Sequence, residues 1–172
     1  RTPILVFAVA DSVDEAAAAI RAGLTLTVAT PGSVRMVAEA ADRVGAIAQV
    51  HLKVDTGMGR VGLPAEQQTE SLEALKTAEQ VSLQGLYSHL ADSEANDGLT
   101  RQQTERFCRL MESLSPRPPV CHLANSGGGL RPPCRLDMVR VGIALYGGTP
   151  LYSTEPVMSV LSRLAQVRDF QP

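Results

Sequence analysis

The sequence has few cysteines and no long apolar run. Its three cysteines, Cys108, Cys121 and Cys134, are an odd set without the spacing of a metal site, so neither a disulfide framework nor a zinc site is predicted. We therefore expect reduced thiols, no metal and a cytoplasmic location. No stretch approaches the roughly 18 apolar residues that a transmembrane helix needs, and the N-terminus lacks the pattern of a signal peptide.

The charge is nearly balanced. A net charge of −2 gives no electrostatic footprint for nucleic acid or for a membrane surface, so neither partner is expected. Hydrophobic residues make up 44% of the 172 residues and charged residues 20%, which allows a sizeable core. The length fits one ordinary domain or a piece of a larger α/β barrel. Lysine is scarce, with Lys53 and Lys76 beside fourteen arginines.

Strand-like and helix-like stretches alternate along the chain, and Ser12 and Thr30 are suited to cap the first two helices. This alternation predicts a parallel sheet with right-handed crossovers. Either a partial (β/α)8 barrel of the TIM type, with about six of its eight strands, or an open doubly wound sheet would fit. The expected strands are Ile4–Val9, Leu24–Ala29, Ala46–Asp55, Ser82–Leu90, Val120–Asn125 and Leu136–Ile143, followed by a strand-like run at Met158–Val167.

The third expected strand, Ala46–Asp55, has one apolar face and one polar face that includes His51 and Lys53. A parallel strand covered by helices on both sides should be apolar on both faces. One polar face suits a barrel strand whose interior side becomes polar near an active site. The barrel is therefore favoured.

The segment His51–Pro64 is the most informative part of the sequence, because it predicts a strand that ends at a glycine-rich turn with Lys53 and Arg60 at its end. In α/β enzymes the active-site residues commonly lie at strand ends of this kind. From first principles Lys53 could form a Schiff base, or it could be a charge partner for Asp55.

Small residues follow the later strands, at Asn125, Ser126, Gly142 and Ile143. Backbone N–H groups in late βα loops commonly bind phosphate in barrels, and small residues permit close approach. The alternative is that these are ordinary turn residues.

Two histidines and an arginine are further candidates. His89, near a strand end, could carry a proton, orient a site group or be a core histidine, whereas His122 suits a supporting hydrogen-bond partner. Arg140 lies in an apolar stretch, where an unpaired guanidinium would be costly. It therefore needs a partner, either a ligand or a carboxylate such as Asp137.

Four ordered blocks together resemble the bacterial alanine racemases, which are fold-type III enzymes using pyridoxal phosphate (PLP). The blocks are Lys53–Arg60, Gly85–His89, His122–Ser126 and Arg140–Gly147. The resemblance runs over essentially the whole chain. It implies a (β/α)8 barrel followed by a β-rich domain, working as a homodimer with sites at the interface.

The resemblance also implies roles for the candidate residues around the cofactor. Arg140 would face the pyridine nitrogen, and a permanently charged guanidinium there disfavours protonation of the ring. His89 would pack and hydrogen-bond around Arg140, with His122 behind it. The PLP phosphate would be held by Asn125, Ser126, Gly142 and Ile143.

On the substrate side, the resemblance implies that Arg60 binds the PLP phenolic oxygen and the carboxylate of alanine. Lys53 is often carbamylated in this family, which turns a cation into an anion able to brace Arg60. Lys53 is then not the Schiff-base residue.

The chain also departs from the family pattern. Nothing in it matches the family's Schiff-base lysine, and none of its tyrosines, Tyr87, Tyr146 and Tyr152, lies in the context of the family's second catalytic base. We therefore expect a fragment, with an incomplete PLP-binding barrel over residues 1–150 and a linker plus the start of a β domain over residues 151–172. Because both bases are missing, the isolated chain should be inactive.

The expected function of the whole enzyme is interconversion of L- and D-alanine for peptidoglycan precursors, by two-base proton removal and return at Cα. One alternative is a broader-specificity amino-acid racemase, for example of serine. Another is a non-catalytic PLP-binding barrel protein, although Arg140 argues against a simple carrier.

Overall fold

The computed structural model describes residues 2–169, and within them five strands form one parallel sheet. Neighbours in the sheet are neighbours in the chain, in the order β1-β2-β3-β4-β5. A doubly wound sheet reverses its strand order at a switch point, whereas barrel strands follow one another in sequence. The strands are β1 (Leu5–Val9), β2 (Thr25–Val28), β3 (Ala48–Lys53), β4 (Val81–Tyr87) and β5 (Val120–His122).

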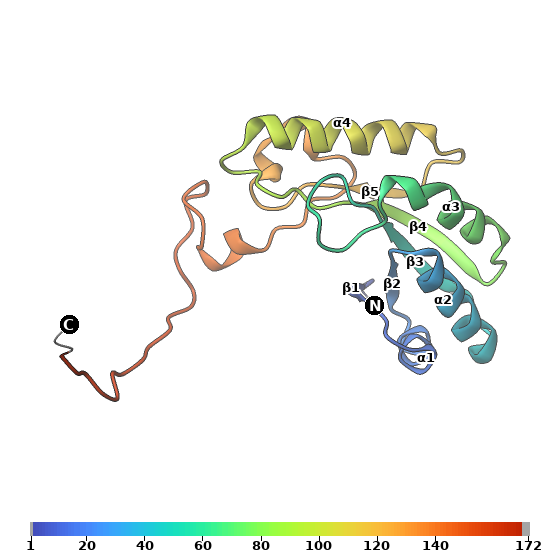
Figure 1. Cartoon of the computed structure of the whole chain (residues 1–172), viewed down its shortest axis with the longest axis horizontal. Helices are drawn as coiled ribbons and strands as arrows, with labels where there is room; N and C mark the ends of the chain where they lie inside the picture. Colours follow the sequence, from blue (N-terminus) through green and yellow to red (C-terminus); the bar gives the residue numbers. More distant parts are fainter. Residues whose placement is uncertain (1, 170–172) are drawn as a thin grey trace.

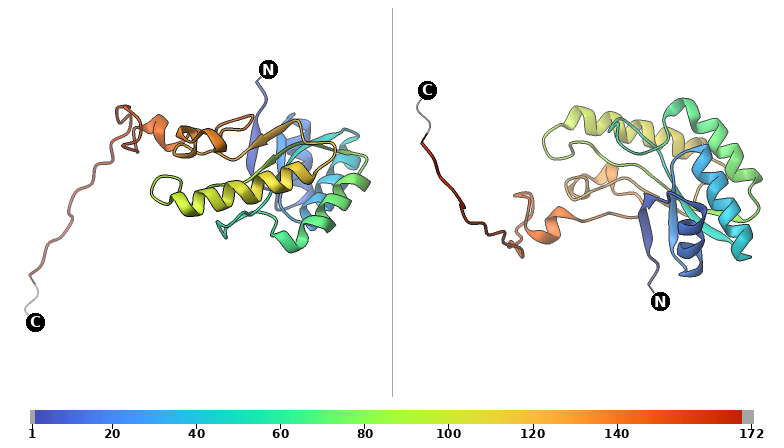
Figure 2. Two further views of the ribbon diagram at one scale, coloured as in Figure 1. Left: turned by 90° about the horizontal axis from the view of Figure 1, so that it is seen from above. Right: turned by 60° about the horizontal axis from the view of Figure 1, so that its bottom comes forward.

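The helices between the strands lie on one side of the sheet, so that the strands curve inside an arc of helices (Figure 1). Figure 2 shows the same arrangement from two further directions. The expected partial (β/α)8 barrel is confirmed. The α-helices are α1 (Val13–Arg21), α2 (Pro31–Val44), α3 (Gln68–Thr77) and α4 (Asp97–Ser113), and a 3-10 helix, Ala65–Gln67, leads into α3.

Both predicted helix N-caps are present. The Ser12 hydroxyl accepts a hydrogen bond from the Glu15 backbone N–H, and the Thr30 hydroxyl accepts one from the Ser33 N–H. The Ser33 side chain in turn accepts from the Thr30 N–H, which completes a capping box at the start of α2. These bonds satisfy N–H groups that a helix start leaves unpaired.

The main core lies between the sheet and the helices. The apolar face of β3 and its continuation, with Val50, Leu52 and Val54, is at most 1% exposed. These side chains belong to one cluster with Val34 and Val37 of α2. The alternate β3 side chains therefore point toward the concave face of the sheet, as the two-residue period of a strand requires.

Two strand predictions are wrong. Leu136–Ile143 forms only an isolated bridge, between His122 and Met138, and Ile143 instead begins a 3-10 helix, Ile143–Tyr146. Within residues 2–169 no further strand lies on its outer side, so this segment has a ladder partner on β5 alone. Leu136 also has a positive φ of 44°, which interrupts an extended backbone.

The run Met158–Val167 is not a strand either. It extends away from the sheet with its apolar side chains exposed, for example Leu161 at 93%. A strand needs a neighbour to pair its N–H and C=O groups, and this run has none among the described residues.

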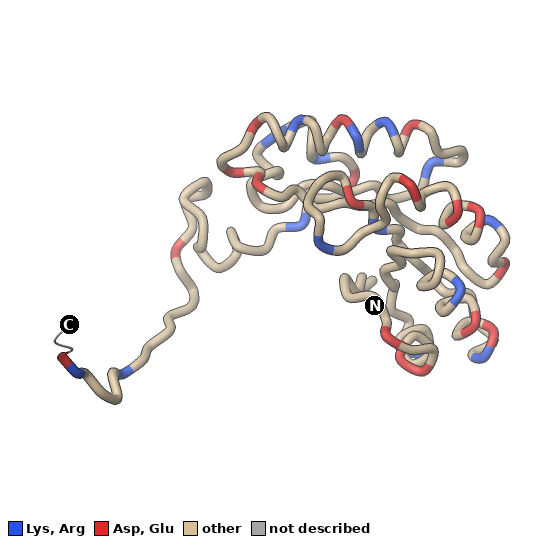
Figure 3. Tube along the Cα trace, in the orientation of Figure 1, with Lys and Arg blue, Asp and Glu red and all other residues tan. Residues whose placement is uncertain are grey.

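Charged residues of both signs are spread along the outer helices (Figure 3). Glu39 and Arg43 of α2 form an ion pair one helical turn apart, as on an ordinary solvated face. Across residues 2–169, none of the helices combines the length and apolarity needed to span a membrane.

Candidate functional site

Polar side chains from neighbouring strands meet on the concave face of the sheet, near the carboxyl ends of the strands. Lys53 pairs in register with Tyr87, and Tyr87 with His122. The Tyr87 ring lies at the centre, with the Lys53 ammonium 5.5 Å and the Arg140 guanidinium carbon 5.4 Å from its centroid. Both distances are within the range of cation–π attraction.

Arg140 is held by neutral groups. Its guanidinium lies 2.6 Å from Nδ1 of His122, and it donates to the carbonyl oxygens of Ser88 at 2.6 Å and Leu123 at 3.1 Å. Burial lowers the pKa of Arg140 to about 10, opposed by the nearby Tyr87. Arg140 therefore remains charged at neutral pH.

Asp137 is not the partner of Arg140. Its carboxylate instead accepts hydrogen bonds from the Arg117 side chain and from the Cys121 backbone N–H. No ion pair of Arg140 with an acidic residue exists in the part of the chain that the structure describes. The partners that the structure gives Arg140 are thus the neutral acceptors of His122, Ser88 and Leu123 rather than a carboxylate.

The expected hydrogen bond between His89 and Arg140 stays a prediction, and the imidazole that contacts the Arg140 guanidinium among the described residues is that of His122. His89 lies near enough to feel the charges of the site: burial lowers its pKa to about 4, helped by Arg140 and Arg60. His122, expected behind His89, is the direct partner and is fully buried.

The late loops bring Ser126 and Gly142 together. The Ser126 hydroxyl accepts hydrogen bonds from the backbone N–H groups of Gly142 at 3.1 Å and Ala144 at 3.3 Å. Ile143 follows directly and starts the 3-10 helix. Both N–H groups are therefore used on the Ser126 oxygen, while the Ser126 hydroxyl can still donate its own proton. A Cβ atom added at Gly142 would meet nothing within 4 Å, so this side of the turn is open. A hydroxyl donor at an open turn fits an oxygen of a phosphate group.

The side chain of Asn125 hydrogen-bonds to the neighbouring loops and not to Ser126 or Gly142. Its side-chain oxygen accepts from the Ser93 hydroxyl at 2.6 Å and from the Gly128 N–H at 3.0 Å, and its amide donates to the Leu90 carbonyl. The Asn125 side chain therefore joins the loops after β4 and β5 and orders the turn in which Ser126 lies.

Lys53 is 7% exposed and lies among cations. Burial lowers its pKa, and the charges of Arg60 and Arg140 lower it further, while Asp55 opposes them. A lysine in these surroundings carries a larger share of neutral, nucleophilic amine than an exposed one.

Asp55 is a loop organiser rather than an ion-pair partner of Lys53. Its carboxylate accepts three backbone hydrogen bonds of 2.8 Å, from Gly57, Met58 and Gly59. Asp55 therefore shapes the turn that presents Arg60, which is exposed at the end of the loop. Gly62 has a φ of +146°, and a Cβ atom at this position would lie 2.8 Å from backbone atoms of Val54 and Asp55. Only glycine fits here, so the end of the loop can pack directly against its beginning.

Helix α4 braces this loop from outside. Gln103 is fully buried and donates to the His89 carbonyl at 3.0 Å and to the Thr56 hydroxyl at 3.3 Å. Arg106 donates to the Thr56 carbonyl at 3.0 Å. The loops after β3 and β4 are thus both held by side chains of α4, and the sequence pattern gave no indication of this contact.

Sequence reasoning placed His51 on the polar face of its strand without giving it a role, and it missed Thr27 and the contacts of Tyr87. The Thr27 and Tyr87 hydroxyls lie 2.8 Å apart, and His51 is 7% exposed beside His122. The available signal was the two-residue period: these residues share the concave faces of β2, β3 and β4.

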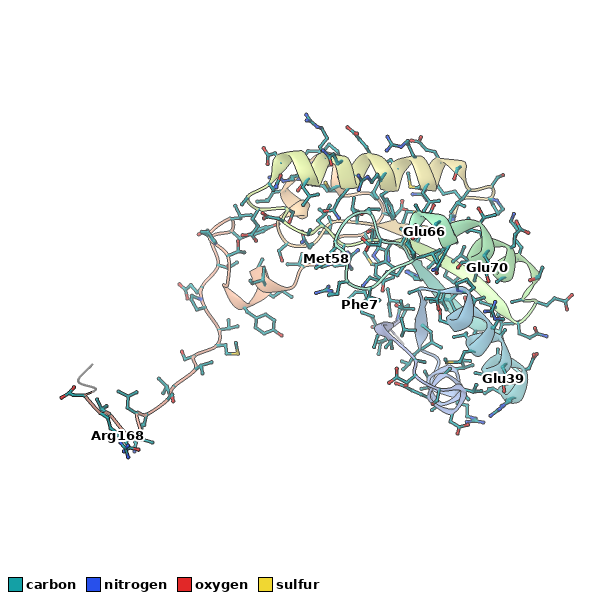
Figure 4. All side chains as sticks on the ribbon, viewed as in Figure 1. Phe7, Glu39, Met58, Glu66, Glu70 and Arg168 are labelled. Atoms are coloured by element: carbon teal, nitrogen blue, oxygen red, sulfur yellow. The ribbon has the colours of Figure 1, made fainter. Side chains whose placement is uncertain are left out.

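The site is an open surface on the concave side of the sheet. Figure 4 shows Phe7 and Met58 on this side, whereas Glu39, Glu66 and Glu70 lie on the outer helices. Phe7 is 51% exposed, and the Arg140 guanidinium carbon lies 5.9 Å from the centroid of its ring.

A sequentially wound parallel sheet with cations at its carboxyl edge defines part of an α/β barrel. The family model of the alanine racemase N-terminal domain matches residues 1–150. An alanine racemase of Prochlorococcus marinus is 42% identical over 134 residues, which cover 70% of this chain and 35% of that protein.

Solved structures of racemases have a similar fold. An alanine racemase of Clostridium difficile 630 superposes with a TM-score of 0.78 at 30% identity, over 87% of this chain and 40% of that chain. A histidine racemase of Leuconostoc mesenteroides superposes with a TM-score of 0.76 at 29% identity, over 85% and 40%. The chain belongs to the alanine racemase family, and it spans less than half the length of these relatives.

Proposed function

We propose that this chain is the cofactor-holding and carboxylate-binding part of a PLP-dependent alanine racemase, which interconverts L- and D-alanine for peptidoglycan precursors. One observation carries the proposal: Lys53, Arg60 and Arg140 gather at the strand ends and, within residues 2–169, none of them forms an ion pair. Such a site calls for anionic ligands, and a phosphate ester together with an amino-acid carboxylate would meet that need.

The residues present fit PLP. The Ser126 hydroxyl and the Ile143 backbone N–H would hold its phosphate, with Asn125 ordering the turn. The Gly142 N–H, which donates to the Ser126 oxygen in this structure, would join them by turning to a phosphate oxygen. Arg140 would face the ring nitrogen, with His122 and His89 around it. When bound, the cofactor supplies an electron sink for the carbon that loses its proton. A fixed positive charge at the ring nitrogen keeps that nitrogen unprotonated and moderates the sink.

Arg60 and Lys53 would act on the substrate side. The Arg60 guanidinium offers a planar fork of donors that matches a carboxylate. A neutral Lys53 amine can add to CO2, forming a C–N bond and releasing a proton, and the resulting carbamate would be an anion beside Arg60. Lys53 then orients the arginine rather than reacting with the cofactor.

The side chain of the substrate is a separate question. A family neighbour described as a histidine racemase shares this fold at a TM-score of 0.76, so the barrel accommodates more than one amino acid. The second candidate function is therefore racemisation of a broader set of amino acids, serine among them. The residues assigned above would bind the cofactor and the carboxylate common to both.

Binding of pyridoxine 5′-phosphate by the full chain, followed by fluorescence titration, tests the proposal. This probe keeps the ring and phosphate but lacks the aldehyde, so Lys53 and Lys76 cannot trap it covalently. We expect it to bind at least about tenfold more tightly than pyridoxine, which lacks the phosphate. Ser126→Val should remove that preference, whereas Ser113→Ala, at an exposed position of α4, should leave it unchanged. Equal affinity for both probes would contradict the phosphate site.

The same preparation tests activity. Because the chain contains no residue matching either catalytic base, L-alanine should not be converted to D-alanine even with PLP present, as measured by a D-amino-acid oxidase assay. Measurable turnover would show that a base lies within the 172 residues.

A further inference from the structure

Two buried histidines on neighbouring positions of the concave face contact each other directly. Nδ1 of His51, on β3, lies 2.9 Å from Nε2 of His122, on β5. Their ring centroids are 5.1 Å apart, and the side chains belong to residues that are 7% and 0% exposed. The other ring nitrogen of His122, Nδ1, faces Arg140 at 2.6 Å. His122 therefore lies between His51 and Arg140.

The hydrogen-bond chemistry of these groups allows one neutral arrangement. A guanidinium has only donors, so Nδ1 of His122 must carry the lone pair and Nε2 must carry the proton. That proton points at Nδ1 of His51, which must then be an acceptor, with the His51 proton on Nε2. Protonating His51 at Nδ1 would place two N–H groups against each other and break the contact.

Gly85 of β4 makes room for this pair. A Cβ atom at this position would lie 2.4 Å from Nδ1 and from Cε1 of His51, far inside van der Waals contact. Gly85 is the register partner of His51 across β3 and β4, where the pairing shifts by one residue. The His51 ring can therefore take this place only because residue 85 has no side chain.

We propose that His51 is a positioning residue for Arg140: it accepts the Nε2 proton of His122 and so holds the Nδ1 lone pair of that ring on the guanidinium. Without this acceptor, His122 would bury an unpaired N–H, and its ring would gain by rotating away from Arg140. The importance of the contact for cofactor binding rests on the proposed function, in which Arg140 faces the ring nitrogen.

The surroundings offer no substitute for His51. Tyr87 stacks on the face of the His122 ring, at a centroid distance of 4.7 Å, and its hydroxyl is engaged with Thr27. Asp137 influences the pKa of His122 but accepts its hydrogen bonds from Arg117 and the Cys121 N–H. The other charged or titratable groups acting on His122 are Arg140, which is charged, and His51, which is titratable. The His122 Nε2 proton thus depends on His51 alone among the described residues.

Long-range ¹H–¹⁵N NMR of the imidazoles in the full chain tests the arrangement without any ligand. At neutral pH both His51 and His122 are expected as Nε2–H tautomers, whereas an exposed histidine exchanges between tautomers and its charged form. A His122 ring protonated at Nδ1 would overturn the proposal, whatever the chain binds.

Two substitutions then separate positioning from packing. His51→Leu fills the site but removes the acceptor, whereas His51→Asn keeps an oxygen near the place of Nδ1. We expect His51→Leu to speed hydrogen exchange of the Arg140 guanidinium protons about tenfold and to weaken pyridoxine 5′-phosphate binding about tenfold. His51→Asn should stay within about threefold of the unsubstituted chain in both. Gln49→Leu, at an exposed position of β3, is the matched control.

The outcomes are distinguishable. Unchanged guanidinium exchange in a folded His51→Leu chain would overturn the positioning role. If the unsubstituted chain does not bind pyridoxine 5′-phosphate, the proposed function fails, and the exchange measurement still decides whether His51 positions Arg140. If His51→Leu does not fold, the tautomers of the unsubstituted chain and the exchange rates in His51→Asn decide it.

Discussion

The imidazole of His122 lies flat on the phenol ring of Tyr87, with the centroids 4.7 Å apart and the ring planes 4° apart. The Tyr87 hydroxyl lies 2.8 Å from that of Thr27, and Thr27 donates its own proton to the Val6 carbonyl. Tyr87 must therefore be the donor to Thr27. One side chain thus ties the first two strands to the ring that holds Arg140.

Removing the Tyr87 hydroxyl should cost stability without removing the stack. Tyr87→Phe leaves a buried Thr27 oxygen with one partner fewer, so we expect the free energy of unfolding to fall by about 1 kcal/mol in urea denaturation. Thr27→Val should cost a similar amount, and the double variant should cost less than the sum. Tyr146→Phe, at a residue 57% exposed, is the control and should have no effect. Strict additivity of the two changes would contradict the assigned contact.

Asp55 should protect the loop that carries Arg60. Asp55→Ala leaves the N–H groups of Gly57, Met58 and Gly59 without their acceptor, so the loop should open more often. We expect trypsin to cut after Arg60 several-fold faster, measured by mass spectrometry of timed digests. Asp42→Ala, at an exposed position of α2, is the control and should leave this rate unchanged. Equal cleavage in both variants would remove the role given to Asp55.

Lys53 should form a carbamate more readily than Lys76. The pKa of Lys53 is lowered by burial and by Arg60 and Arg140, whereas Lys76 is exposed and paired with Glu73. In ¹³C-labelled bicarbonate we expect one carbamate NMR signal besides that of the α-amine of the chain, and Lys53→Met removes it whereas Lys76→Met preserves it. The signal should grow as the pH rises through the lowered pKa, because only the neutral amine reacts. A lysine carbamate signal that survives Lys53→Met would refute the assignment.

The buried histidines should make the chain sensitive to acid. Their pKa values lie below the usual 6.5, at about 4 for His51 and His89 and about 3 for His122, mainly because burial disfavours the charged form. The unfolded chain therefore takes up protons first as the pH falls. The stability is complete above about pH 6.5 and is lost progressively toward about pH 4.

The midpoint of urea unfolding, measured at about pH 7 and at about pH 4.5, tests this direction of the pH dependence. The midpoint should be lower at the acidic pH. His122→Asn removes the group with the lowest pKa and should reduce the difference between the two midpoints. A midpoint that is the same at both pH values would mean that the histidines are not buried as neutral rings.

Much of the fold could be predicted from local pattern. The five parallel strands and the caps at Ser12 and Thr30 depend on the spacing of apolar and capping residues, which the sequence displays directly. The expected strand at Leu136–Ile143 failed because Leu136 has a positive φ and the segment meets β5 only at the His122–Met138 bridge, neither of which an apolar pattern reveals.

The site was harder to predict than the fold. Spacing placed Lys53 and Ser126 at strand ends and Arg140 within an apolar stretch, and the structure brings Lys53 and Arg140 against the same tyrosine. Spacing could not rank His122 above His89 as the partner of Arg140, because that choice depends on distances between strands. The contact of His51 with His122 likewise depends on the space at Gly85 and on the register shift beside it.

The unbalanced cations at the strand ends also have a kinetic consequence. With Arg60 and Arg140 on one open concave face, and Lys53 beside them as long as it carries no carbamate, the local charge is positive although the whole chain carries a net charge of −2. A dianionic ligand would be drawn toward this face before any contact forms, so salt should slow its capture more than its release.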